Sequence, residues 1–152
     1  MSKLKKTLEQ MLDKLAMHDP IIQQARMPKL ILQSLELGIS EIESKKREWS
    51  KVEPDEFFFA YRQAEDDLAE LEYLDSSAGL KDLVIQEKKA LRKLLPVLHA
   101  IDEMFSLYDT TDVDGGDPIK FETTKLLAAP ILYSAKKSHE RIIGLLKKHK
   151  RN

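Results

Sequence analysis

Apolar residues recur at intervals of three and four along most of this chain, and that spacing places them on one face of an α-helix. The first stripe ends at Asp19-Pro20, where Asp19 can cap a short second helix. We expect that second helix to run from Ile21 to the break at Met27-Pro28. The residues of the first stripe are Leu4, Leu8, Met11, Leu12 and Leu15.

A third helix should begin near Pro28 and stop before Pro54, because a residue that precedes proline disfavours the helical conformation. Its stripe is Ile31, Leu35, Gly38, Ile42 and Trp49, with the charged run from 43 to 48 facing solvent. A fourth helix follows and closes at residues 75–79. Its stripe alternates by four and three, as in helices that bury a shared seam: Phe57, Tyr61, Ala64, Leu68 and Leu71.

The longest stripe spans about four heptads and predicts a central helix, the spine of the protein. Glu87 is its polar interruption. Pro96 lies inside the helix and should kink it, because proline has no N–H to donate. The apolar positions are Leu80, Val84, Leu91, Leu94, Leu98, Ile101 and Phe105.

The span from Asp109 to Asp117 is predicted to be a loop, and Asp117 should cap a last helix that begins at Pro118 and is kinked at Pro130. The sequence therefore predicts an all-α protein, a helical bundle of about four long helices plus one or two short N-terminal helices. We expect one domain over residues 1–152, with a basic end at 136–151 that could fray.

Composition narrows the chemistry that such a bundle could perform. The chain has 152 residues, 42% of them hydrophobic, and a formal net charge of -1, so it should bury a core of its own. Because it has no cysteine, disulfides, thiolate metal centres and cysteine nucleophiles are excluded. We find neither a signal peptide nor an apolar run long enough to span a membrane, and we expect a cytoplasmic protein that binds no membrane.

The acidic loop over residues 112–117 does not fit a calcium site. An EF-hand needs glycine at its sixth position and glutamate at its twelfth. Placing Gly115 sixth puts Phe121 twelfth, and placing Gly116 sixth puts Val113 at the third, ligating position. The chain also lacks Glu-x-x-His, His-Glu-x-x-His and glycine-rich phosphate motifs, so we expect no metal and no cofactor.

Charge is segregated along the chain. Residues 53–75 hold nine acids against Arg62, and residues 136–151 hold seven bases against Glu140. The two segments could pair within the chain, or the basic end could bind an acidic partner through Lys147, Lys148, Lys150 and Arg151. Because the basic end has no interleaved aromatics and no recognisable reading module, nucleic acid is not the expected partner.

Phe57, Phe58 and Phe59 are consecutive, and Tyr61 follows them. One helix face cannot bury three consecutive rings. At least one ring should therefore point away from the seam, against the N-terminal helices or towards a protein partner.

Arg92 and His99 lie two helical turns apart on the same side of the central helix, and Glu103 lies one turn beyond. The arginine and histidine resemble those of HEPN domains, which are helical, metal-independent ribonucleases. The resemblance implies that His99 acts as acid or base while Arg92 holds the scissile phosphate. The other interpretation is a surface histidine with an ordinary carboxylate neighbour.

The segment from Leu91 to Asp102, LRKLLPVLHAID, resembles the "LLPVLDNLE" segment of GrpE nucleotide exchange factors. Residues 142–149, IIGLLKKH, resemble in spacing the "LLxVLxKHG" helix end of the same family. The likeness covers roughly residues 87–149. His99 stands where that family has aspartate, and the sequence ends where its β-domain would begin. The resemblance implies a dimeric bundle and an Hsp70-type chaperone as partner, without ordinary exchange activity.

These features together predict a non-enzymatic helical interaction protein, in its most specific form a GrpE-like co-chaperone or scaffold. We expect a homodimer that associates through the spine helix at Leu94, Leu98 and Ile101, together with a further protein partner. The alternative is a HEPN-like ribonuclease that uses Arg92 and His99.

Overall fold

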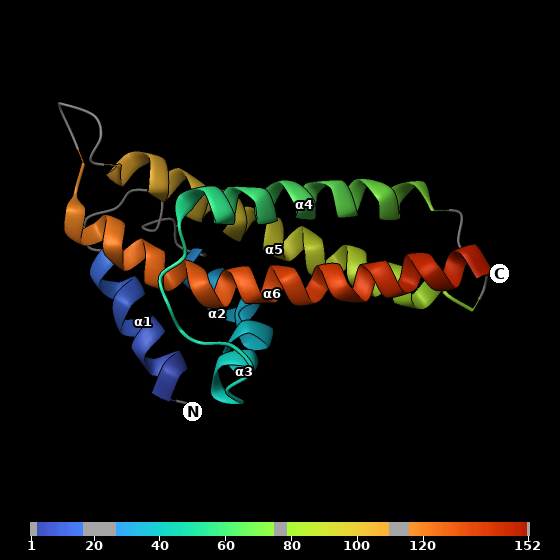
Figure 1. Ribbon diagram of the computed structural model, residues 1–152, viewed down its shortest axis with the longest axis horizontal. Coiled ribbons are helices and arrows are strands. Elements are labelled where there is room, and N and C mark those ends of the chain that lie inside the picture. Colours follow the sequence, from blue (N-terminus) through green and yellow to red (C-terminus); the bar gives the residue numbers. More distant parts are fainter. Residues whose placement is uncertain (1–2, 17–26, 75–78, 110–115, 152) are drawn as a thin grey trace.

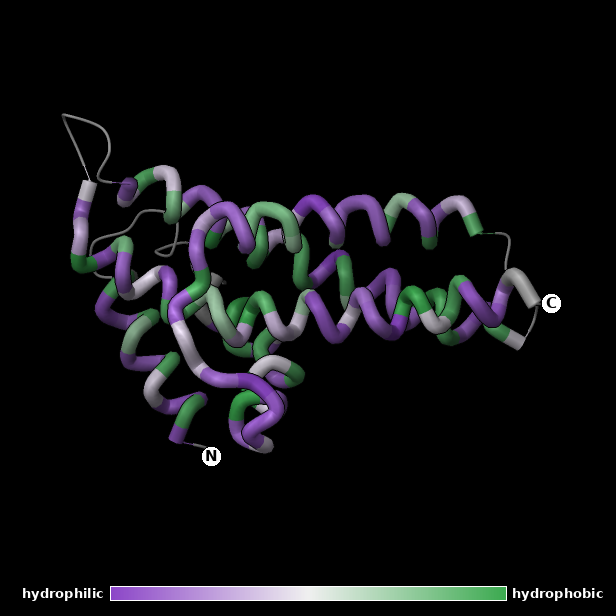
Figure 2. Tube along the Cα trace, in the orientation of Figure 1, coloured by the Kyte–Doolittle hydropathy of each residue, from purple (hydrophilic) through white to green (hydrophobic). Residues whose placement is uncertain are grey.

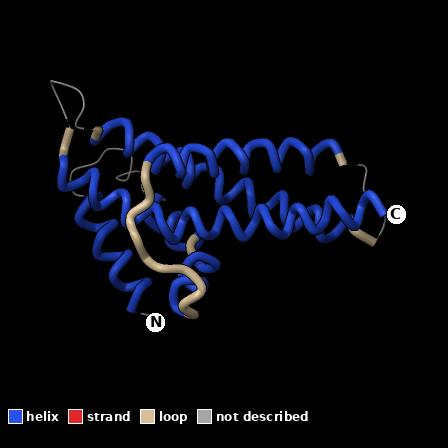
Figure 3. Tube along the Cα trace, viewed as in Figure 1, coloured by secondary structure: helices blue, strands red, loops and turns tan. Residues whose placement is uncertain are grey.

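A computed structural model describes residues 3–16, 27–74, 79–109 and 116–151 of the chain. Within those ranges it contains helices and loops but no strand (Figure 3), which confirms the all-α prediction. The helix expected from Ile21 and most of the acidic loop lie outside the described residues. The helices are α1 (Lys3–Ala16), α2 (Met27–Ser34), α3 (Glu36–Glu43), α4 (Pro54–Tyr73), α5 (Lys81–Tyr108) and α6 (Pro118–Arg151).

The three longest helices, α4, α5 and α6, run side by side (Figure 1). Helices α1 and α3 pack against α6, and α2 packs against α1 and α5. The start of α6 is capped as predicted, because Asp117 Oδ1 accepts a hydrogen bond of 3.1 Å from the Lys120 N–H. The helix then continues through Pro130 and through the basic segment 136–151, as far as Arg151.

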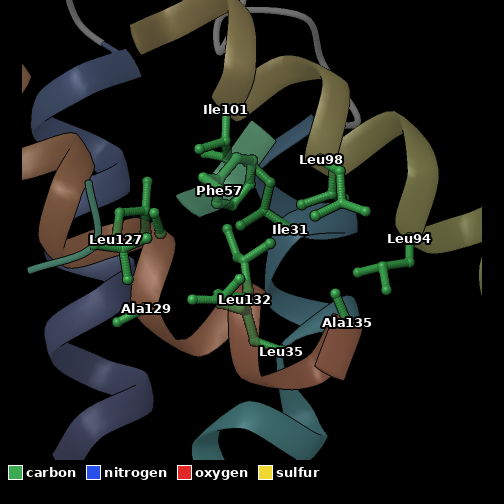
Figure 4. Packing of buried hydrophobic residues seen from close by; sticks show 14 of the residues in the cluster. Ile31, Leu35, Phe57, Leu94, Leu98, Ile101, Leu127, Ala129, Leu132 and Ala135 are labelled. Atoms are coloured by element: carbon green, nitrogen blue, oxygen red, sulfur yellow. The ribbon is translucent and has the colours of Figure 1, made fainter. Parts of the chain in front are cut away.

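Side chains from α2, α4, α5 and α6 meet in the core (Figure 4), where Ile31, Phe57, Leu98 and Leu132 are almost inaccessible to solvent. Hydrophilic positions alternate with the apolar ones along each helix (Figure 2). The predicted spine positions are all buried, and each large apolar side chain contributes about 1.5–3 kcal/mol by leaving water. They are Leu80, Val84, Leu91, Leu94, Leu98, Ile101 and Phe105.

The spine residues that were predicted to form a homodimer interface are buried within one chain. Leu94, Leu98 and Ile101 are at most 6% exposed, so they pack the chain's own core and leave no apolar stripe there for a second copy. These three residues are therefore not available as a dimer interface, and dimerisation through any other surface stays a prediction.

Glu87, the polar residue in the spine, faces a partner on α6. Its carboxylate accepts two hydrogen bonds from the Arg141 guanidinium, of 2.7 and 3.3 Å. Two parallel bonds from one guanidinium hold the two side chains in a defined orientation. The interruption of the apolar pattern is therefore a cross-link between α5 and α6.

The third predicted helix is wrong in its extent. The chain turns at Leu35 between α2 and α3, and α3 ends at Glu43. Lys45 adopts a left-handed conformation with φ of 62°, and the N–H groups of residues 46 and 47 both bond to the Glu41 carbonyl. This turn closes the helix, as left-handed residues commonly do at helix C-termini. Residues 44–53, here called the strap, then run without helical structure to α4 (Figure 3).

The strap is bound to α6 where Pro130 interrupts the helical hydrogen bonds. Because proline has no N–H, the Leu126 carbonyl lacks the donor that would normally come from four residues ahead. The Trp49 indole Nε1–H donates to that carbonyl over 2.8 Å. Two further hydrogen bonds hold the strap, one from the Val52 N–H to the Lys125 carbonyl (3.0 Å) and one from the Tyr133 hydroxyl to the Glu48 carbonyl (2.6 Å).

Ion pairs reinforce the end of the strap. Lys51 Nζ lies 2.8 Å from a carboxylate oxygen of Glu122, and this hydrogen bond holds the pKa of Glu122 below its usual value. Lys125 Nζ lies 3.3 Å from Glu53, the residue before α4. The beginning of α4 is therefore tied to α6.

Gly38 allows α3 to lie directly against α6. A Cβ atom at Gly38 would stand 1.8 Å from the Pro130 carbonyl oxygen, far inside van der Waals contact. The Gly38 N–H, which lies in the first turn of α3, donates to the buried Ser134 Oγ over 2.9 Å. Gly38 is thus required by close backbone packing.

Replacing Gly38 with alanine should destabilise the protein, because α3 has to move away from α6. We expect Gly38→Ala to cost about 1–3 kcal/mol or more in free energy of unfolding, measured by urea denaturation. The matched control is Gly144→Ala in α6, where the new methyl group meets no atom of the described residues within 4 Å. That variant should be about 0.5–1 kcal/mol more stable. Equal effects would show that Gly38 does not set the packing distance.

The role of Trp49 can be tested with a double-mutant cycle. Trp49→Phe removes the indole donor and should cost about 1–3 kcal/mol, because the Leu126 carbonyl loses its partner. Pro130→Ala restores an N–H that can bond to that carbonyl within the helix. In the Pro130→Ala background, Trp49→Phe should therefore cost about 1 kcal/mol less. A zero coupling energy would contradict the link between the two residues.

Candidate interaction site on helices α4 and α6

The three consecutive phenylalanines have three different environments. Phe57 is fully buried and packs edge-on against Phe105, with ring centroids 5.7 Å apart. Phe58 is 41% exposed and lies beneath the guanidinium of Arg62. Phe59 is 73% exposed. The prediction that at least one ring points away from the core is confirmed, and Phe59 is the ring that is most exposed.

Phe59 borders a groove of about 400 Å³ between α4 and α6. Small side chains form its apolar lining, because alanines occur on both helices where large residues would close the gap. The groove is lined from the strap by Arg47, from α4 by Glu56, Phe59, Ala60, Gln63 and Ala64, and from α6 by Ala135, Lys136, His139 and Glu140.

The charged residues around the groove pair with one another. Lys136 Nζ lies 3.5 Å from a carboxylate oxygen of Glu56 on α4. Arg47 of the strap lies 3.9 Å from Glu140 on α6. Because each positive group has a nearby negative one, the groove offers little net charge, and its exposed ring and alanine lining suit an apolar side chain.

His139 joins α6 to a buried carboxylate on α4. Its Nδ1 lies 2.7 Å from Asp67 Oδ2, and Asp67 is 2% exposed. The amide of Gln63 donates to the other carboxylate oxygen over 3.1 Å. The His139 side chain therefore satisfies a buried acid beside the groove.

Pairing within the chain, one of the two alternatives for the acidic and basic segments, is found for part of each segment. It rests on the contact of Lys136 with Glu56 and of His139 with Asp67. Farther along α6, Lys147 and Lys148 are exposed and form no ion pair within the described residues. The side chains of Lys150 and Arg151 lie outside what the structure describes. An acidic partner for this end stays a prediction.

Arg92 and His99 are both exposed on α5, but each is held by a different partner. The Arg92 guanidinium lies 3.1 Å from Glu72 at the end of α4. Seven residues of helix separate the two side chains by about 10 Å along the axis. This arrangement matches the interpretation of surface residues with carboxylate neighbours.

The imidazole of His99 has both ring nitrogens occupied. Nδ1 lies 3.0 Å from the Tyr61 hydroxyl, and Nε2 lies 2.6 Å from a Glu103 carboxylate oxygen. Burial, together with the charge of Glu65, raises the pKa of Tyr61, so the phenol keeps its proton. Both ring nitrogens therefore contact side chains of the chain's own surface.

No protein-family model, curated protein or solved structure matches the chain. None of the helices in the described ranges combines the length and apolar character that crossing a bilayer requires. Nor do three or more histidine or carboxylate side chains among the described residues come together in a way that could hold a metal ion.

Removing His139 should destabilise the protein by leaving Asp67 buried with one fewer hydrogen bond. We expect His139→Ala to cost about 1–3 kcal/mol in free energy of unfolding. The matched control is His99→Ala, which removes an exposed histidine–carboxylate pair and should cost about 1 kcal/mol or less. Both can be measured by urea denaturation at neutral pH. If the two variants lose the same stability, the buried contact has no special role.

Proposed function

We propose that this chain is a non-enzymatic interaction protein and that the groove between α4 and α6 receives an apolar side chain of a protein partner. The observation that carries the proposal is the 73% exposure of Phe59 at the edge of this groove. A large ring so exposed leaves apolar surface in water, and aromatic side chains dominate the binding energy of protein interfaces.

The surroundings of Phe59 favour binding by apolar contact. The charges nearby are paired, so a partner needs no matching charge at the centre of the interface. The groove wall is also held in place, because His139 and Asp67 connect the two helices. A surface that is ordered before binding loses less conformational entropy when the partner docks.

An Hsp70-type chaperone is the specific partner that we propose from the resemblance to GrpE. The two segments that resemble that family lie in α5 and α6, which pack against each other. This likeness is the support for the chaperone, whereas the groove supports a protein partner in general. The two parts of the proposal can therefore fail separately.

Phe59→Ser should abolish binding of the partner without loss of stability, because the ring contributes little to the core. The tagged chain is used to capture proteins from a cell lysate, and the bound proteins are quantified by mass spectrometry. We expect at least one protein captured by the wild type to fall by about tenfold or more with Phe59→Ser. A purified Hsp70-type chaperone, assayed by calorimetry, tests the specific partner.

Tyr73→Ser provides the matched control. Tyr73 is 90% exposed and lies on the same helix, but it does not line the groove. This variant should capture the same proteins as the wild type. Identical capture by Phe59→Ser and the wild type would refute the groove as the binding site, and equal losses in both variants would indicate nonspecific adhesion of exposed rings.

A further inference from the structure

A second cavity, of about 510 Å³, lies on another side of α6, between α5 and the junction of α2 and α3. Its volume is within the range of small-molecule sites in proteins. One face of α5 contributes residues between Gln86 and Leu94, spaced by three and four. Ser134, Ser138 and Arg141 come from α6. None of these residues belongs to the groove at Phe59.

Ser138 carries a hydroxyl that has no hydrogen-bond partner among the described residues. The residue is 3% exposed, and its Oγ has no hydrogen bond within the described part of the chain. Helical serines and threonines usually bond back to the preceding turn. In the same helix Thr123 and Thr124 do so, over 2.9 and 2.7 Å. A buried polar group without a partner is unfavourable, and a ligand oxygen in the cavity would supply the missing bond.

Two lysines give the cavity a positive side. Lys89 and Lys93 are one turn apart on α5, both are exposed, and neither forms an ion pair with any described residue. Like charges at this spacing repel each other, and an anion between them would relieve that repulsion. Arg141 is already bound by Glu87, which neutralises it, and Glu36 is the one acid among the described residues that line the cavity.

The rest of the lining is mixed: Gln33, Ser34, Gln86 and Ser134 are polar, and three residues form an apolar wall. Leu37, Ala90 and Leu94 contribute the side chains that would contact the hydrocarbon part of a ligand. From this combination we propose that the cavity binds a small amphiphilic anion, with its carboxylate or phosphate between Lys89 and Lys93, its aliphatic part on the apolar wall and an oxygen at Ser138. This is a ligand site independent of the protein groove.

Octanoate, octyl phosphate and octanol are suitable probes, because they share a chain and differ in the head group. Each is titrated into the isotope-labelled full-length chain, and backbone amide shifts are followed by NMR. We expect the two anions to saturate with one ligand per chain and to shift amides of residues 86–94 and 134–141. Octanol should bind about tenfold or more weakly, and the stronger anion identifies a carboxylate or a phosphate as the natural head group.

Variants assign the binding to the proposed groups. Lys89→Gln combined with Lys93→Gln should weaken the anions by about tenfold and leave octanol unchanged. Lys147→Gln combined with Lys148→Gln is the matched control, because it removes the same charge from exposed positions outside the cavity. It should leave all three affinities unchanged. Ser138→Ala should weaken the anions several-fold without lowering the melting temperature, because it removes a hydroxyl that has no partner.

Three results would overturn the proposal. The first is no saturation by either anion up to about 10 mM, a concentration that would reveal even weak specific binding. The second is equal affinity for octanol and octanoate, which would remove the role of the charge. The third is unchanged anion binding in both the double lysine variant and Ser138→Ala, which would place the anion elsewhere.

Discussion

The contact of α3 and the strap with α6 around Pro130 determines where the other helices lie. Proline removes one donor from α6, and Trp49 supplies a replacement from the strap. The Pro130 carbonyl lies four residues after the Leu126 carbonyl that Trp49 binds. Because Gly38 has no side chain, α3 can approach this Pro130 carbonyl closely. Because the strap leads directly into α4, these contacts set the beginning of α4 on α6. They therefore position Phe59, five residues into α4, at the groove.

Periodicity was sufficient to predict the elements whose burial follows from local spacing. Most positions of the apolar stripes of α1, α4 and α5 are buried as expected, whereas Met11, Tyr61 and Leu68 are only partly buried. The Asp117 cap was also recognisable from the sequence. The strap could not be recognised in this way. Trp49 continues the stripe of the third predicted helix, yet its indole bonds to a carbonyl 77 residues away. A long-range hydrogen bond of this kind leaves no trace in the local pattern.

The candidate site could likewise be predicted only in part, because some of its features follow from local spacing and others from long-range packing. The sequence indicates that three adjacent rings cannot share one face, but the packing of α4 on α6 decides that Phe57 is buried and Phe59 exposed. The groove is also not apparent from the sequence, because its alanines are ordinary helix residues. Asp67 and His139 are 72 positions apart, and each alone has the appearance of a solvated charge or a helix flank. Only the fold brings them together.

Two polar pairs between the helices together fix the rotation of α6 about its axis. Arg141 bonds to Glu87 of α5, and His139, two residues before it, bonds to Asp67 of α4. Burying such pairs costs desolvation energy, and an apolar seam of the same shape can be equally stable. Leucine contacts, however, tolerate small rotations of a helix about its axis, whereas two short hydrogen-bonded pairs on different sides do not. The pairs thus fix the rotation of α6, and this in turn keeps Ala135 and Lys136 facing the groove while Ser134 and Ser138 face the second cavity.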